Sequence, residues 1–574
     1  MIKIEVNNRL IDAMENETIL SALKREGITV PTLCHVEGLL PSGACRMCVV
    51  ELENTGRLIP SCSFPVQEGM RIKTHSPKAI DARRTIVELL LADHPDDCLY
   101  CARNGCCELQ KLAENLGVRV RRYTGSRVDY HVDLSSPAII RTQEKCILCG
   151  KCVRICEEIQ GVSAIDFAKR GSSAIIATAF NESLNVSSCV SCGQCTAVCP
   201  TGALVEHSQI EEVVSALNDP EKIVVIQHAP AVSVSLAEEF GLKPGTDVQG
   251  IMTAALRKMG FDRVFDTAFS ADVTIMEEAS ELIERIKSGG PLPLITSCSP
   301  AWVKFAETFY PGFLPNISTC KSPQQMLGAI IKSYWVEKEK IDPAKVFSVA
   351  VMPCTAKKFE ATRPELADAG YAEIDAVLTT RELAKMIRRY GIEFAGLEPE
   401  VNDLPFGTRS SAAKLFAGSG GVMEAALRTA SNLLTGTDLK QVKIKPARGL
   451  EGIKEFKFKI GDLELGCVVL SGLKNARIIL DQMKAGRDDI HFIEIMSCPG
   501  GCINGGGQPI GVNKENVAAR LQALYKIDMG EYTRMSHQNP AVQDLYRDYL
   551  GKPNSHKAHE LLHTHYEERD ILLK

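Results

Sequence analysis

Cysteine is the residue type that carries most of the possible chemistry in this sequence. Sixteen of the 22 cysteines precede residue 200, and the other six are spread over the rest of the 574 residues. Cysteines repeated at tight spacing, in a chain whose start does not resemble a secretory signal, indicate metal ligation rather than disulfides. The distribution predicts an electron-transfer half followed by a half in which the reaction takes place.

The first cysteine group has the spacing C-x10-C-x2-C-x13-C and comprises Cys34, Cys45, Cys48 and Cys62. Three cysteines close together with a fourth from a later strand are typical of a plant-type [2Fe–2S] cluster. A four-cysteine zinc site is the weaker alternative, because zinc knuckles usually use two short C-x2-C pairs. Around this group, apolar alternation predicts a strand at Ile2–Val6, and a helix is expected over 18–24.

The second group has the spacing H-x3-C-x2-C-x5-C and comprises His94, Cys98, Cys101 and Cys107. One histidine with three thiolates suits zinc nearly as well as it suits a [4Fe–4S] cluster. The neighbouring iron–sulfur motifs favour the cluster. Cys106 adjoins Cys107 outside the pattern, and we expect it to be a bystander.

The third group is an internal repeat of C-x2-C-x2-C-x3-C, the signature of bacterial two-cluster ferredoxins. In such tandems the fourth cysteine of each run ligates the other cluster. We therefore expect one [4Fe–4S] cluster on Cys146, Cys149, Cys152 and Cys199. The second is expected on Cys189, Cys192, Cys195 and Cys156.

The elements that follow must position the reactive site. Short apolar runs at 223–227, 292–296 and 347–352 predict strands, and the periodicity of 248–259 and 379–389 predicts helices. Alternating strands and helices indicate an α/β domain with largely parallel strands, whose ligand site lies beyond the strand carboxyl ends. Cys298, Cys354 and Cys498 each follow a predicted strand, so they are expected to converge on one metal centre.

Three stretches carry a resemblance to a known family: Thr296–Trp302 (TSCSPAW), Met352–Glu360 (MPCTAKKFE) and Glu494–Pro509 (EIMSCPGGCINGGGQP). They resemble the signature motifs of [FeFe] hydrogenases. Together with the N-terminal cysteine groups, they make nearly the whole chain similar to the long clostridial monomeric form. The resemblance implies the reaction 2H⁺ + 2e⁻ ⇌ H₂.

The fold class implied is multidomain α/β and α+β. The expected domains are a plant-type [2Fe–2S] ferredoxin-like domain (1–77), a His-ligated [4Fe–4S] domain (78–126), a two-[4Fe–4S] ferredoxin domain (127–206), an H-cluster catalytic domain (207–510) and a helical tail (511–574). The tail resembles the separate small subunit of periplasmic relatives, with helices expected over 540–549 and 558–566. Its histidines, His556, His559, His563 and His565, are expected on a solvated helix face.

In this family an H-cluster joins a [4Fe–4S] cubane to a two-iron azadithiolate subsite that carries CO and cyanide. The resemblance assigns Cys354, Cys498 and Cys502 as cubane ligands, with Cys502 as the bridging thiolate. It assigns Lys357 to a hydrogen bond with a cyanide. It places five residues around the subsite: Ala229, Pro230, Met352, Pro353 and Met496. The glycines after Cys502 are expected to let the backbone approach the cofactor.

One position departs from the family pattern, which usually reads T-S-C-C-P. The second cysteine normally ligates the cubane, and here that position is Ser299. Three schemes fit: Ser299 ligates through oxygen, Cys298 takes over ligation and gives up proton transfer, or the chain is a variant with a perturbed or three-cysteine-bound cubane. An alcohol is a far poorer iron ligand than a thiolate at neutral pH, so activity, rather than the fold, is in question.

Proton transfer is the other requirement of the implied reaction. The stretch 274–287 is a predicted helix on which Glu278 and Glu281 share a face. The family match assigns these two residues, Ser318, Arg285 and Cys298 to the proton path. Without the match, all four glutamates of the helix would be assigned to a solvated acidic face. That assignment is kept for Glu277 and Glu284.

Composition excludes several function classes. The net charge is −5, so no basic field indicates nucleic acid binding, and no apolar run approaches the roughly 20 residues of a membrane span. A cytoplasmic location is expected.

The implied partners are ferredoxin or a similar electron carrier and dedicated maturation proteins. One alternative is the catalytic subunit of an NAD(P)-linked or electron-bifurcating complex, and another is a non-catalytic hydrogen sensor or iron–sulfur assembly relative. Cys320 and Cys467 fit no motif and are expected to be buried, inert thiols.

Overall fold

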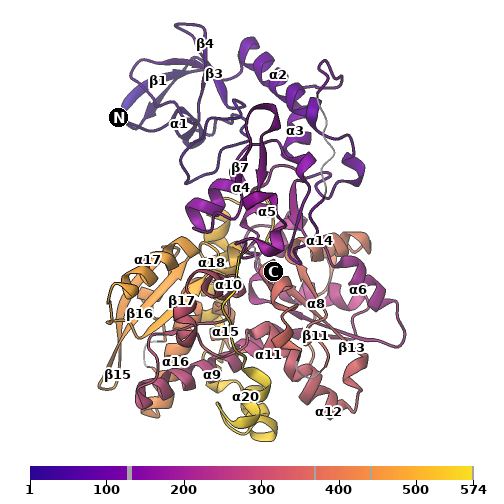
Figure 1. The fold of residues 1–574 in the computed structure, drawn as a ribbon, viewed down its shortest axis with the longest axis vertical. Helices are drawn as coiled ribbons and strands as arrows, with labels where there is room; N and C mark the ends of the chain where they lie inside the picture. The colour runs from indigo at the N-terminus through magenta and orange to yellow at the C-terminus, as the bar shows by residue number, and fades with distance from the viewer. Residues whose placement is uncertain (126–131, 368–369, 440–441, 572–574) are drawn as a thin grey trace.

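The computed structural model describes residues 1–125, 132–367, 370–439 and 442–571. In Figure 1 the cysteine-rich N-terminal segments form the narrow upper part of the molecule, and the elements after residue 206 form the broad lower part. The expected boundary between residues 126 and 127 lies outside the described residues.

The first 77 residues fold around a five-stranded sheet of order β2-β1-β5-β3-β4. Its strands are β1 (Ile2–Val6), β2 (Arg9–Ala13), β3 (Val49–Leu52), β4 (Arg57–Pro60) and β5 (Arg71–Lys73). Helix α1 (Ile19–Arg25) begins where the Thr18 side chain accepts a hydrogen bond from the Ser21 N–H. The strand and helix expected in this region are both present.

The next segments contain short elements that connect cysteines. They are α2 (Pro77–Asp93), α3 (Glu108–Asn115), β6 (Ile139–Arg141), α4 (Lys151–Arg154), β7 (Asp166–Ala168), β8 (Ile175–Ala177), α5 (Gln194–Val198) and β9 (Leu204–Glu206). The internal repeat of the sequence is also a repeat of the backbone. Gly150 and Gly193 directly precede α4 and α5 and share a φ of 70° and a ψ of 6°. Glycine adopts this left-handed conformation at the lowest cost, which explains its place in both cysteine runs.

The lower part contains two four-stranded sheets. The first, of order β11-β10-β13-β14, is entirely parallel, and the second has the order β12-β17-β16-β15 with one antiparallel pair. The strands are β10 (Ile223–His228), β11 (Arg263–Asp266), β12 (Leu294–Ile295), β13 (Val346–Met352), β14 (Ala376–Thr379), β15 (Ile453–Ile460), β16 (Leu463–Ser471) and β17 (Phe492–Met496). Of these, β12 is shorter than the strand expected over 292–296.

Helices cover both faces of these sheets. They are α6 (Ile210–Leu217), α7 (Pro230–Ser233), α8 (Gln249–Lys258), α9 (Thr267–Ser288), α10 (Pro300–Phe309), α11 (Pro323–Ile330), α12 (Val336–Glu339), α13 (Ala356–Glu360), α14 (Thr380–Arg389), α15 (Ser411–Leu415), α16 (Gly421–Thr435) and α17 (Leu473–Lys484). In the first sheet, Val224 and Ile226 pack towards α8, while Val225 packs towards α9 and α11. Successive strand residues point to opposite faces, so a continuous apolar run is buried on both.

Helix α9 lies between the two sheets and contributes to both cores. Phe269 and Val273 pack with the first sheet, and Ala271 and Ile275 with the second. The helix expected over 274–287 starts seven residues earlier than predicted, because the Asp266 side chain accepts the Ala268 N–H and caps it. This central position brings the glutamates of α9 to the interior of the lower part.

The tail contains α18 (Lys514–Gly530), α19 (Pro540–Leu545) and α20 (His556–Leu562). The prediction of a helix over 558–566 is wrong at its end, because the chain is extended after Leu562. Its backbone pairs there with another segment: the Thr564 N–H donates to the Thr319 carbonyl and the Lys321 N–H to the Leu562 carbonyl, both at 2.7 Å. Among the described residues, no helix combines the length and hydrophobicity that crossing a membrane would require.

Candidate active site and electron conduit

The first cysteine group comes together as two hydrogen-bonded thiol pairs, Cys34 with Cys45 and Cys48 with Cys62. The bond from Cys45 is the main reason that the pKa of Cys34 falls to about 4. The hydrogen bond with Cys62 is the main reason that the pKa of Cys48 falls to about 6, and the same bond raises the pKa of Cys62. A smaller upward effect of the Cys34 charge on both residues shows that the two pairs are neighbours. Three of the four residues are buried, which gives a compact, shielded set of sulfur ligands.

The second group lies beside the ferredoxin-like repeat. His94 is buried at the end of α2, and burial followed by the charges of Cys101 and Cys98 raises the pKa of Cys107. A side chain at Gly202 would meet Cys101 Sγ at 2.5 Å, so glycine is needed for this close approach. The structure therefore brings the three cysteines together at the edge of the next cluster region.

The tandem cysteines line two separate cavities of about 30 Å³ each. One is lined by Cys146, Cys149, Cys152 and Cys199, and the other by Cys156, Cys189, Cys192 and Cys195. The fourth cysteine of each run thus faces the cavity of the other run. In the described ranges, no group of three or more candidate ligands is arranged to hold a single metal ion.

A larger cavity of about 90 Å³ lies in the lower part, where strands of both sheets end. Its wall includes the candidate ligands Cys298, Ser299, Cys354, Cys498 and Cys502. It also includes Ala229, Pro230, Met352, Pro353, Met496 and Lys357. The segments after β10, β12, β13 and β17 meet here, as expected for the carboxyl ends of parallel strands. The cavity is enclosed mainly by apolar groups and thiols, a donor set that suits an iron–sulfur cofactor.

Among the thiols of this cavity, Cys498 is buried, and Cys298, Cys354 and Cys502 are half-buried where they line its wall. Burial is the largest cause that raises the pKa of Cys502 to about 12, with a smaller opposing effect of the Lys357 cation. Burial also raises the pKa of Cys354 and Cys498. Thiolate ligands here need a strong compensating positive charge, which bound iron supplies.

The segment that carries the tandem cysteines, residues 146–199, touches this cavity directly. Cys192 lines both the catalytic cavity and one of the ferredoxin-like cavities. The Gln194 side chain donates hydrogen bonds to Cys498 Sγ and to the Asn504 carbonyl, both at 3.2 Å. Gln194 was missed by sequence reasoning, although its place between two cysteines of the tandem motif is a usable signal.

The glycine triplet after Cys502 allows close backbone packing in addition to the approach to the cofactor that was expected of it. A side chain at Gly506 would meet the Cys192 carbonyl at 2.3 Å, and one at Gly505 would meet the Pro353 carbonyl at 2.1 Å. Of the three glycines, Gly505 alone lines the cavity. The triplet mainly lets the catalytic backbone pack against the ferredoxin-like segment and against Pro353.

Ser299 lies on the cavity wall with its hydroxyl already occupied. Its Oγ lies 2.7 Å from Ser497 Oγ and accepts the Ser497 N–H at 3.3 Å. Ser497 precedes Cys498, so this contact joins two of the motifs. Sequence reasoning missed Ser497, because no distance between motifs can be obtained from the chain order.

Lys357 is held by a carboxylate. Its Nζ lies 2.8 Å from Glu360 Oε2, and its carbonyl accepts a hydrogen bond from the Gln324 side chain at 3.3 Å. Lys357 and Gln324 both line the cavity, so the ion pair keeps a cation at its wall.

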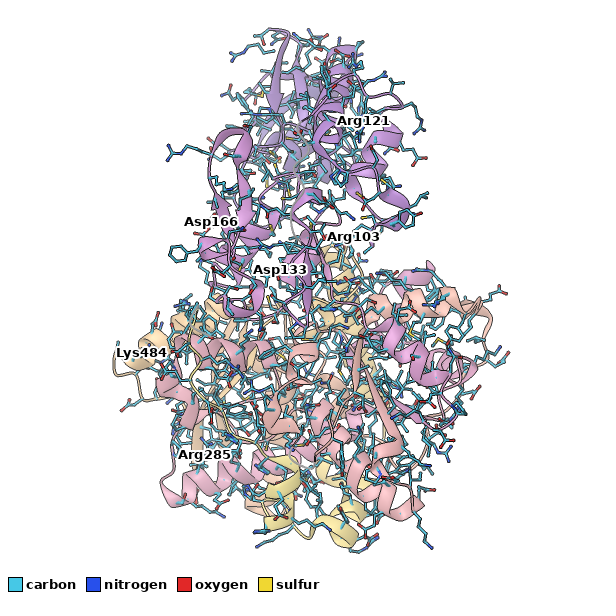
Figure 2. The ribbon with its side chains drawn as sticks, turned by 45° about the vertical axis from the view of Figure 1, so that its right-hand side comes forward. Arg103, Arg121, Asp133, Asp166, Arg285 and Lys484 are labelled. Carbon is cyan, nitrogen blue, oxygen red and sulfur yellow. The ribbon has the colours of Figure 1, made fainter. Side chains whose placement is uncertain are left out.

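The candidate proton path runs along α9. Arg285 Nη2 lies 2.6 Å from Glu281 Oε1, and Ser318 Oγ donates to Glu281 Oε2 at 2.7 Å. Glu278 is fully buried, and its Oε1 accepts the Ser297 N–H at 3.4 Å, while its Oε2 has no partner among the described residues. Burial, and then the charge of Glu281, raises the pKa of Glu278 to about 8. Figure 2 shows Arg285 in the lower part of the molecule, well away from Arg103 and Arg121 in the cysteine-rich upper part.

Two expectations for nearby residues are wrong. Glu277 does not lie on a solvated face, because it is fully buried and accepts hydrogen bonds from the tail. His563 is buried as well, in contrast to His556, whose side chain is 90% exposed. Cys320 and Cys467 are buried, as expected.

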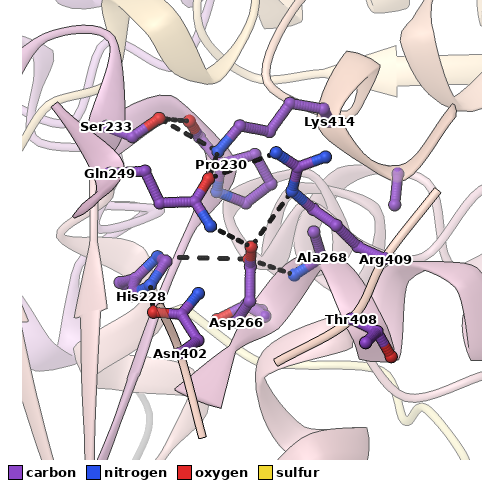
Figure 3. Close-up of polar contacts among 12 residues, drawn as sticks. His228, Pro230, Ser233, Gln249, Asp266, Ala268, Asn402, Thr408, Arg409 and Lys414 are labelled. Atoms are coloured by element: carbon purple, nitrogen blue, oxygen red, sulfur yellow. Dashed lines mark hydrogen bonds and ion pairs between the residues drawn. The ribbon is translucent and has the colours of Figure 1, made fainter. Parts of the chain in front are cut away.

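A buried polar network supports the cavity wall from behind (Figure 3). Asp266 pairs with Arg409 at 3.2 Å and lies 4.0 Å from His228, the residue before Ala229. Lys414 donates to Ser233 Oγ at 3.0 Å and to Gln249 Oε1 at 2.7 Å. The network ties the end of β10 to the end of α7, to the start of α9 and to α15. Sequence reasoning missed it, because its members are scattered along the chain and match no motif.

Known protein families match nearly the whole chain. Residues 222–506 match the iron only hydrogenase large subunit, C-terminal domain, and residues 514–569 match the iron hydrogenase small subunit. Residues 1–77 match a 2Fe-2S iron-sulfur cluster binding domain, and 145–203 a 4Fe-4S dicluster domain. Residues 83–122 match the NADH-ubiquinone oxidoreductase-G iron-sulfur binding region.

Individual relatives agree with these matches. The NADP-reducing hydrogenase subunit HndD of Solidesulfovibrio fructosivorans is 48% identical over 100% of both chains. Iron hydrogenase 1 of Clostridium pasteurianum is 39% identical over 99% of this chain and 100% of its own. A solved structure of the [FeFe]-hydrogenase HydA1 from Chlamydomonas reinhardtii is 41% identical, covers 63% of this chain and 99% of its own, and has a TM-score of 0.57.

These matches confirm the prediction of a hydrogenase with N-terminal iron–sulfur domains and a large catalytic domain. With relatives of this identity along its full length, the chain belongs to the [FeFe] hydrogenase family.

Proposed function

We propose that this hydrogenase interconverts protons and H₂ in the cavity lined by Cys354, Cys498 and Cys502. The observation that carries the proposal is that this one cavity touches the tandem-cysteine segment at Cys192 and has at its wall Cys298, whose pKa is raised by burial and then by the charge of the buried Glu278 of α9. When bound, the H-cluster supplies the redox centre at which electrons and protons combine. The three cysteines would hold it, and Lys357 would face it with a positive charge.

Electrons would travel through four accessory clusters, one [2Fe–2S] and three [4Fe–4S]. Their ligands are the cysteines of the three N-terminal groups, the third of which would hold two clusters, with His94 as the single nitrogen ligand. The cavities lined by the tandem cysteines support two of these clusters. The contact of Gln194 with Cys498 supports a direct route from the last of them to the active site.

Protons would pass from the Arg285 end through Glu281, Ser318 and Glu278 to Cys298. The hydrogen bond between Ser318 and Glu281 supports the outer part of this route. Glu278 is suited to the inner part, because its raised pKa keeps it protonated at neutral pH and its Oε2 is free for a proton carrier. A single water is enough to connect such groups.

For the electron partner, we favour partner subunits linked to NADP over free ferredoxin. The relative with that activity in its name matches this chain end to end, at a higher identity than the iron hydrogenase does. No dinucleotide-binding fingerprint follows a strand in this sequence, so any NADP chemistry would belong to partner chains. Maturation proteins would install the two-iron subsite, and the cytoplasmic location stays a prediction.

Infrared spectroscopy tests the assignment of the cofactor. Protein produced with the maturation proteins is expected to show bands of metal-bound CO and cyanide and to turn over H₂. Protein produced without them is expected to contain iron–sulfur clusters but no such bands. Turnover in a matured sample that lacks the bands would contradict the proposal.

Replacing Glu281 with Gln tests the proton route. We expect a roughly 100-fold loss of turnover, because the amide cannot carry a proton between Arg285 and Ser318. Electron paramagnetic resonance of the reduced clusters should be unchanged. The matched control is Glu284→Gln on the exposed face of the same helix, which should keep full turnover. Equal activities of the two variants would remove Glu281 from the route.

The pKa of Glu278 predicts a pH dependence. A carboxyl group that titrates near pH 8 is a proton donor below that pH and a charged base above it. At a fixed driving force, H₂ evolution should therefore fall as the pH rises through about 8. In Glu278→Gln the remaining activity should be low and lack this step. If the fall in H₂ evolution near pH 8 persists in the variant, a group other than Glu278 is responsible for it.

The substitution Ser299→Cys tests the missing ligand. Because a thiolate binds iron far better than an alcohol does, we expect more iron in the catalytic cluster and slower loss of that iron to a chelator. Iron content, chelator kinetics and turnover should be compared with wild type and with Ser297→Cys, a neighbouring serine on the same segment. Values identical to wild type would show that Ser299 is no handicap to cluster binding.

A further inference from the structure

The segment that carries Ser318 is held between the catalytic domain and the C-terminal tail. On one side, Ile317 pairs with Ile295 of β12, and the Ser318 N–H donates to the Ile295 carbonyl at 2.8 Å. On the other side, Cys320 pairs with His563 in antiparallel fashion. The tail thus completes a small sheet at the point where the proposed proton route passes through Ser318.

Tyr566 strengthens this pairing with its side chain. Its hydroxyl lies 3.2 Å from the Ser318 carbonyl and 3.3 Å from the Cys320 carbonyl, so it can donate to either. Because both acceptors are backbone groups, the contact fixes the path of the segment rather than one side chain. The position of Ser318 therefore depends on residues that lie almost 250 positions later in the chain.

Glu277 is the matching anchor on α9. One of its carboxylate oxygens accepts the Tyr546 hydroxyl, and the other accepts the Asn554 N–H at 2.7 Å. A fully buried carboxylate needs such partners, because leaving it without hydrogen bonds is costly. Every one of these partners comes from the tail, so the tail is tied to the helix that carries Glu278 and Glu281.

His563 joins the two anchor points. Its Nε2 lies 3.2 Å from Glu277 Oε2, and its Nδ1 lies 2.7 Å from Thr319 Oγ1. One imidazole ring therefore spans the gap between α9 and the 317–321 segment. The hydrogen bond between Glu281 and Ser318 crosses the same gap, one turn further along the helix.

We propose that His563 is a positioning residue for proton transfer, which keeps Ser318 within hydrogen-bond reach of Glu281. The inference rests on the proposed proton route. Hydrogen bonds weaken steeply beyond about 3.5 Å, and a displacement of about 1 Å in a reacting pair can cost roughly 100-fold in rate. A rigid ring that holds both sides of the gap at fixed distances is suited to prevent such a displacement. The tail would thus act in catalysis without touching the active-site cavity.

The experiment compares His563→Ala with His563→Gln in the matured full-length protein. We expect His563→Ala to lower turnover at least 10-fold and to increase the solvent deuterium isotope effect, while the cluster spectra stay unchanged. His563→Gln should recover part of the rate, because an amide can bond to one of the two partners. His556→Ala, which removes an exposed histidine from the same tail, should behave as wild type.

A second readout does not depend on turnover. Amide hydrogen exchange of residues 319–321 and thiol labelling of the buried Cys320, both followed by mass spectrometry, report on the position of the segment. Both should be faster in His563→Ala than in His556→Ala. If His563→Ala does not fold, Thr319→Val decides the matter, because it removes only the bond to Nδ1 and should show the same changes in smaller measure.

The outcomes separate the two proposals. Unchanged exchange and labelling in His563→Ala would overturn the positioning role, and so would faster exchange combined with full turnover and an unchanged isotope effect. If Glu281→Gln keeps full activity, the proton route itself is wrong. Faster exchange in His563→Ala would then describe only how the tail is docked, and the catalytic role of His563 would fall with the route.

Discussion

The constraint on which the structure depends is the enclosure of several thiols in one apolar cavity. Burial raises the pKa of Cys354, Cys498 and Cys502, so these groups become thiolates only where a bound cofactor returns a comparable positive charge. Parallel strands achieve the enclosure because their carboxyl ends face the same side, which brings residues from distant parts of the chain to one point. The surrounding helices, buried charges and tail all keep that point closed and its walls in place.

An enclosed redox site must still receive electrons and protons, and the two supplies reach it by different physical means. The electron side needs short distances between clusters and no mobile groups. Close backbone packing provides this, as where Gly506 lies against Cys192 and where Gln194 contacts Cys498. The proton side needs groups that can change their protonation state. In the proposed route these would be the carboxyl groups of α9 and the Ser318 hydroxyl, and the raised pKa of the buried Glu278 suits it to hold a proton at neutral pH.

The buried polar residues outside the cavity connect separate elements of the fold. Asp266, Arg409 and Lys414 connect the elements that form the cavity wall, and Glu277 with His563 connects the tail to α9. Charged groups are costly to bury, but a satisfied network of them has a strict geometry, whereas apolar contacts tolerate sliding. A site that transferred protons over single hydrogen bonds, as proposed here, would benefit from that strictness.

The sequence by itself determined the order of the iron–sulfur regions and the largely parallel strand architecture, because these follow from local spacing and periodicity, while the catalytic cofactor was implied by the resemblance of three motifs to a known family. It predicted Cys354, Cys498 and Cys502 as ligands through their motifs, and it located the strands that precede them. Only the tertiary structure decided how separate motifs touch, since distances between segments are not encoded in their spacing. It revealed the hydroxyl pair of Ser299 and Ser497, the use of Gly506 in domain packing and the burial of Glu277. The helix expected to reach Tyr566 ends at Leu562 for the same reason: backbone pairing with residues 319–321, far away in the chain, outweighs the local helical pattern.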